Sequence, residues 1–150
     1  MHRSSLIDNR WQVVIINNSD SNYKNFKILF NKFGLAIGDL KNQVTYIDGK
    51  TFNKLGLCED HIYAIEAHEI GHYILGHGAI SNEININKEE LEKEADFAAY
   101  NILLKIRKPV AAKLIKERYF NHYGKPIEDF TIQFSKFLKI QKYINEIKNI

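Results

Sequence analysis

The chain has 150 residues, of which 45% are hydrophobic and 26% are charged, which is enough for one domain with a hydrophobic core. This composition excludes a wholly disordered chain, and no apolar run approaches the roughly 18 residues that cross a membrane. We therefore expect a single domain over residues 1–150 and no membrane association. The lone Cys58, and an N-terminal segment without the apolar core of a secretory signal, favour the cytoplasm.

The net charge of +3 is divided unevenly along the chain. Residues 1–100 carry ten basic and fourteen acidic side chains, whereas residues 101–150 carry eleven basic and four acidic ones, a net of +7. Such a basic segment is typical of solvated helix faces, of a docking surface for an acidic protein segment, or of nucleic-acid binding. We rank nucleic acid last because the segment has no convincing helix-turn-helix pattern.

Hydrophobic periodicity predicts two short strands with a helix between them in the first fifty residues. The β-branched run 11–16 and the alternating run 43–47 are the expected strands. Apolar side chains on one face of 23–33 predict the helix, which ends at Gly34. Asp48-Gly49 predicts a turn after the second strand.

Four helical segments are expected in the remainder, at residues 59–77, 88–106, 110–120 and 127–148. The second ends before Pro109, and the last two form a basic helical part over about 110–150. The predicted fold class is therefore α+β: a mainly helical single domain with a small sheet beside the helix at 59–77.

A His-Glu-x-x-His motif, His68-Glu69-Ile70-Gly71-His72, lies in the first of these helical segments. Residues four apart stack on one helical face, so the imidazoles of His68 and His72 can approach one metal ion. Two imidazoles are half of a tetrahedral Zn²⁺ site, and Glu69 can serve as base for a metal-activated water without binding the metal. Gly71 costs a helix about 1 kcal/mol relative to Ala, which predicts another element packed closely against it.

A third ligand is available from a later helix. The metzincin pattern needs a histidine six residues after His72, where this chain has Gly78, and is excluded. A Glu-x-x-x-Asp pattern is present as Glu92 and Asp96, which share one helical face. Glu92 can complete a zinc site while Asp96 accepts the outer N–H of a ligand histidine. By the same helical geometry, Glu94 is expected to face solvent.

These two segments resemble the ImmA/IrrE family of zinc peptidases, which has a His-Glu-x-Gly-His-x-x-x-Gly-His helix and a later Glu-x-x-Ala-Asn/Asp-x-Phe-Ala helix. Here the first motif runs over 68–77, and the second begins at Glu92, with Phe97 one place earlier than in the family. The resemblance covers about residues 44–105, and the strand at 44–47 resembles the family's active-site edge strand.

The resemblance implies a small cytoplasmic, gluzincin-like zinc endopeptidase. His68, His72 and Glu92 would bind Zn²⁺, Glu69 would be the base, and Asp96 would orient a ligand histidine. Members commonly belong to prophages and mobile elements and cleave a helix-turn-helix repressor. The implied partner is therefore a protein substrate, plausibly a DNA-binding repressor, rather than nucleic acid.

Two other functional classes stay open. A non-catalytic regulator, or a toxin–antitoxin-type partner stabilised by zinc, would have no open metal position and no dependence on Glu69. A nucleic-acid-binding module would use the basic C-terminal third and lose affinity steeply with salt. An endopeptidase also needs a side chain that stabilises the tetrahedral intermediate, and the candidates are Tyr46, His61, His77 and Tyr100. For His77, the sequence favours a structural role at the helix end.

Overall fold

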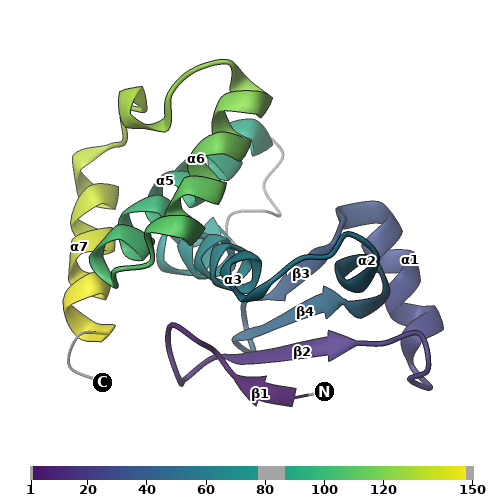
Figure 1. Ribbon diagram of the computed structural model, residues 1–150. Coiled ribbons are helices and arrows are strands. Elements are labelled where there is room, and N and C mark those ends of the chain that lie inside the picture. The colour runs from purple at the N-terminus through teal and green to yellow at the C-terminus, as the bar shows by residue number, and fades with distance from the viewer. Residues whose placement is uncertain (1, 78–86, 148–150) are drawn as a thin grey trace.

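The computed structural model of the protein describes residues 2–77 and 87–147, so that Gly78 and Lys148 lie outside the described residues. It confirms a mainly helical α+β fold in which a small sheet lies beside a group of helices (Figure 1). The described strands are β1 (His2–Ser4), β2 (Gln12–Ile16), β3 (Ala36–Asp39) and β4 (Val44–Asp48). The described helices are α1 (Tyr23–Phe33), α2 (Gly49–Lys54), α3 (Glu59–Ile74), α5 (Lys88–Lys105), α6 (Pro109–Tyr123) and α7 (Phe134–Ile147), with a 3₁₀ turn η1 (Ile127–Asp129).

The sheet is mixed and has the strand order β1-β2-β4-β3. Strands β2 and β4 are parallel, because α1 lies between them in the chain, and β1 and β3 are antiparallel to their neighbours. The sequence does not predict β1 or β3, since both are short and β3 contains Gly38. The expectation that 44–47 is the edge strand is wrong, because β4 pairs with β2 on one side and β3 on the other, which leaves β1 and β3 at the edges.

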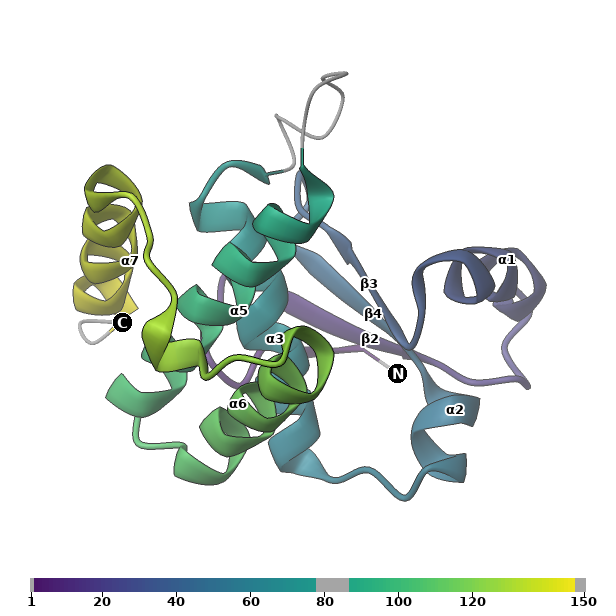
Figure 2. The same cartoon turned by 90° about the horizontal axis from the view of Figure 1, so that it is seen from above.

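Alternating side chains give the sheet two apolar faces. Val14 packs with Phe30 of α1 on one face, whereas Val13 packs with Ile62 of α3 on the other. Figure 2 accordingly shows α1 on one side of the sheet and α3, α5 and α6 on the opposite side. The sheet therefore contacts α3 on the face opposite α1, and α5 and α6 also pack against α3.

The predicted helices are present, but α3 ends at Ile74 rather than at His77 and α6 extends to Tyr123 rather than Phe120. Two further differences have a clear local cause. Asp48 starts α2 instead of a turn, because its carboxylate accepts hydrogen bonds from Thr51 N at 3.5 Å and Thr51 Oγ1 at 2.8 Å. The last predicted helix begins late, at Phe134, because Ile127 is buried in the core as part of the separate turn η1. None of the helices described here combines the length and the apolar character that crossing a bilayer requires.

Helices α3 and α5 cross very closely at Gly71. A Cβ atom at this position would lie 2.7 Å from the carbonyl oxygen of Ala95 and 3.2 Å from Cβ of Ala98. The predicted close packing against Gly71 is confirmed, and its partner is α5. The short separation lets side chains of α5 reach the face of α3 that carries the His-Glu-x-x-His motif.

Candidate metal centre

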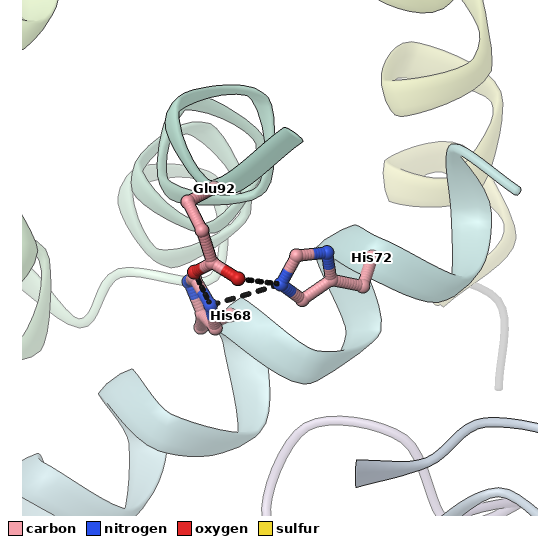
Figure 3. Close-up of side chains that lie close together, drawn as sticks. All are labelled: His68, His72 and Glu92. Atoms are coloured by element: carbon pink, nitrogen blue, oxygen red, sulfur yellow. Dashed lines mark hydrogen bonds and ion pairs between the residues drawn. The ribbon is translucent and has the colours of Figure 1, made fainter. Parts of the chain in front are cut away.

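Three donor side chains converge where α3 approaches α5. His68 and His72 lie one turn apart on α3 and face Glu92, from the start of α5 (Figure 3). His68 Nε2 is 2.9 Å from Glu92 Oε2, and His72 Nε2 is 3.2 Å from Glu92 Oε1. The two Nε2 atoms are 3.1 Å apart. The structure thus brings together the three residues that the sequence predicts as metal ligands.

The spacing of these donors fits a zinc ion. Zn²⁺ binds imidazole nitrogen and carboxylate oxygen at about 2.0–2.2 Å in tetrahedral geometry, which places neighbouring ligand atoms about 3.3 Å apart. The two Nε2 atoms, 3.1 Å apart, come close to that value, and with one oxygen of Glu92 all three donor atoms lie within 4.8 Å of one another. Among the residues described, this is also the one group of three or more such side chains that could hold a metal ion.

Attraction between the imidazoles and the Glu92 carboxylate holds these three side chains together. Burial lowers the pKa of His68, but its hydrogen bonds with Asp96 and Glu92 outweigh burial and raise the pKa to about 9. Burial raises the pKa of Glu92, yet hydrogen bonds from His68 and His72 hold it well below the ordinary value of 4.5. Metal binding therefore has to displace a proton from His68.

Asp96 accepts the outer N–H of His68, as the sequence predicts. Nδ1 of His68 lies 2.7 Å from Oδ1 of Asp96, whose side chain is 1% exposed. Arg118 of α6 donates to the same oxygen, and its Nη2 lies 3.3 Å from His68 Nδ1. The sequence analysis missed Arg118, because nothing near it in the chain identifies the carboxylate that it meets.

The donors open onto a cavity of about 800 Å³ between β3, α3 and α6. Glu69 lines this cavity beside both histidines, as expected for a base. Its carboxylate packs directly against the backbone of β3: a Cβ atom at Gly38 would lie 2.8 Å from Cδ of Glu69. A side chain at this point of the edge strand would force the carboxylate to move.

The comparisons with known proteins identified no relative of this chain. No protein-family model, curated protein or solved structure matches this chain.

The structure separates the four candidates for stabilising a tetrahedral intermediate. His61 alone among them lines the cavity. Tyr46 lies on the α1 side of the sheet, with its ring centroid 4.7 Å from that of Phe26, and Tyr100 lines a different cavity. His77 is buried behind His72, with its Nδ1 2.8 Å from that of His72. Arg118, which also lines the cavity, is a further candidate.

Glu94 is buried, so the expectation that it faces solvent is wrong. Its side chain accepts hydrogen bonds from His77 Nε2 at 2.9 Å and from Lys136 Nζ at 2.7 Å. Helical geometry correctly directs Glu94 away from Glu92, but His77 and α7 cover the face to which it points. Burial also lowers the pKa of His77, which keeps its imidazole neutral.

Proposed function

We propose that this chain is a zinc-dependent endopeptidase of the ImmA/IrrE type that acts in the cytoplasm on a protein substrate. The observation that carries the proposal is the convergence of His68, His72 and Glu92 at the wall of an open cavity, with Glu69 beside them. Catalytic zinc sites use three protein ligands and keep a position open for water or substrate, whereas structural sites use four. The described residues supply three, which favours an enzyme over a zinc-stabilised regulator.

Each polar group has a role in peptide hydrolysis. A zinc ion bound by these ligands supplies Lewis-acid activation of water and of the scissile carbonyl group. Glu69 takes the proton of the attacking water and passes it to the leaving amine. Asp96 holds the Nδ1 proton of His68 and so keeps Nε2 directed toward the other ligands. Arg118 places a positive charge at the cavity wall, where it can stabilise a developing oxyanion.

The walls of the cavity favour an extended peptide with apolar side chains. Edge strand β3 contributes residues 36–38 to the lining, and an edge strand can bind a peptide by main-chain hydrogen bonds. Phe33, Leu35 and Leu114 add apolar surface around it. A helix-turn-helix repressor of a prophage or mobile element remains the substrate expected from the resemblance of the two motifs.

The proposal is tested by zinc content and peptide cleavage measured together. We expect about one equivalent of zinc in the wild type and in Glu69→Gln, and a loss of zinc in His68→Ala and Glu92→Ala. A proteome-derived peptide library, with products identified by mass spectrometry, supplies substrates without knowledge of the natural one. The wild type and the control Glu59→Gln, changed at an exposed position of the same helix, should cleave peptides at shared sites. Zinc-loaded wild type that yields no more products than Glu69→Gln would contradict the proposal.

A further inference from the structure

A buried chain of hydrogen bonds extends from His72 away from the cavity. His72 Nδ1 lies 2.8 Å from His77 Nδ1, and His77 Nε2 lies 2.9 Å from Glu94 Oε1. The other carboxylate oxygen of Glu94 accepts from Lys136 Nζ at 2.7 Å. His77 is 3% exposed and Glu94 is 4% exposed. Together these contacts join α3, α5 and α7 behind the candidate metal centre.

A turn at Gly76 makes the first of these contacts possible. Helix α3 ends at Ile74, and Gly76 follows with φ at +73°, in the left-handed region that favours glycine. The chain thereby changes direction just before His77. The imidazole of His77 can then meet that of His72, which lies five residues earlier in the sequence.

The proton positions along the chain follow from the role of His72. A histidine that binds a metal through Nε2 carries its proton on Nδ1, so His72 donates and His77 accepts. His77 then carries its own proton on Nε2 and donates it to Glu94. The Glu94 carboxylate accepts from His77 and from the ammonium group of Lys136, so that each donor meets an acceptor.

The two ligand histidines are therefore oriented in different ways. His68 donates directly to a buried carboxylate, Asp96, whereas the imidazole of His77 separates His72 from Glu94. A buried carboxylate without a counter-charge is strongly unfavourable, and Lys136 provides that charge. Because Lys136 belongs to α7, the C-terminal helix takes part in fixing the second ligand.

We propose that His77, Glu94 and Lys136 are positioning residues, which orient His72 for metal binding and make metal affinity depend on the docking of α7. This inference rests on the proposed function, because it takes His72 as a metal ligand. The outer hydrogen-bond partner of a ligand histidine typically contributes about 10–100-fold to metal affinity. The effect should be largest for the residue in contact with His72 and smaller with each step away from it.

The inference is tested on the full chain by zinc affinity, measured by competition with a chromophoric chelator, and by the visible spectrum of the Co²⁺-loaded protein. His77→Leu removes the acceptor and should weaken zinc binding by about 10–100-fold. His77→Gln keeps an acceptor for His72 and a donor for Glu94, and should recover most of that loss. Glu94→Gln should weaken zinc binding by about 10-fold, against Glu89→Gln as an exposed control on the same helix.

Lys136→Met changes a residue that is 23% exposed and leaves the buried His77 and Glu94 in place. It should lower zinc affinity several-fold, whereas Lys139→Met, at an exposed position of α7, should not. Circular dichroism in chelator identifies any variant that fails to fold. Folded variants with wild-type zinc affinity and an unchanged Co²⁺ spectrum would overturn the inference, as would equal losses in His77→Leu and His77→Gln.

The outcomes separate this inference from the proposed function. Wild-type protein that binds no zinc would overturn both. Zinc binding that weakens in the His77, Glu94 and Lys136 variants, without peptide hydrolysis, would support the positioning role and overturn the endopeptidase. Peptide hydrolysis together with normal zinc binding in those three variants would support the endopeptidase and overturn the positioning role.

Discussion

Substitution of Gly38 by alanine should impair catalysis without unfolding the protein or removing its metal. The added Cβ would lie 2.8 Å from Cδ and 3.3 Å from Cγ of Glu69, whereas unstrained carbon–carbon contacts are about 3.5–4.0 Å. The Glu69 carboxylate must therefore retreat by about 1 Å, and a misplacement of that size can cost about 100-fold in rate. We accordingly expect kcat of Gly38→Ala to fall by about two orders of magnitude.

The backbone of Gly38 is not in the left-handed region, so alanine can adopt it and should leave the free energy of unfolding unchanged or raise it by about 0.4–1 kcal/mol. The assay compares kcat, zinc content and urea unfolding of the wild type and Gly38→Ala, with a peptide selected from the library. A second pair, in a Glu69→Gln background, tests whether the effect passes through the carboxylate. There the added methyl group should cause no further loss of rate. Wild-type kcat in Gly38→Ala, or an undiminished effect in the Glu69→Gln background, would refute this reasoning.

Three further predictions concern packing, pH and the cavity wall. Gly71→Ala should lower the free energy of unfolding by about 1–3 kcal/mol in urea titrations, because its Cβ would meet the backbone oxygen of Ala95 at 2.7 Å; an unchanged midpoint would show that α3 and α5 can separate freely. In the metal-free protein, the folded-state pKa of His68 is raised from 6.5 to about 9, so its contribution to stability is complete below pH 6.5 and is lost as the pH rises through 9. Urea titrations in chelator across that window should show a loss on the order of 3 kcal/mol, and a loss of equal size in His68→Gln would contradict the assignment to His68. Arg118→Met should lower kcat by about 100-fold with zinc content unchanged, and a change confined to KM would argue against stabilisation of the intermediate.

Local patterns predict the helices well. The boundaries of α1 and α5 agree with the sequence to within a residue, because Gly34 and the Asn87 cap act on the backbone beside them. Strand β3 has no such signal: four half-buried residues including a glycine become a strand only by pairing with β4. The identity of the edge strand is likewise a property of the pairing, which the pattern within 44–47 does not contain.

In the candidate site, too, the sequence predicts features within one helix but not the contacts between helices. His68 and His72 are one helical turn apart, and so are Glu92 and Asp96, so each pair is predictable from spacing alone. Which residues stand opposite each pair depends on how the helices pack. Glu94 illustrates the limit: its direction on α5 follows from helical geometry, but what it meets there comes from outside that helix.

In the folded chain, basic residues of the C-terminal third form ion pairs with buried acidic residues of the first hundred. The excess of basic residues after position 100 is evident from composition, as is the acidic segment that contains the proposed site. Tertiary structure brings two of those basic residues to two buried acidic ones, Arg118 to Asp96 and Lys136 to Glu94.

The sequence by itself therefore determines the helix that carries the motif, the side chains proposed as metal ligands and the spacing of each pair, because these are properties of neighbouring residues. Only the tertiary structure decides that β3 forms the cavity edge, that Gly38 makes room for Glu69, and that α7 supports His72 through Glu94. Those contacts join segments far apart in the chain, and burial makes them strong by excluding the water that would otherwise compete for the same charges.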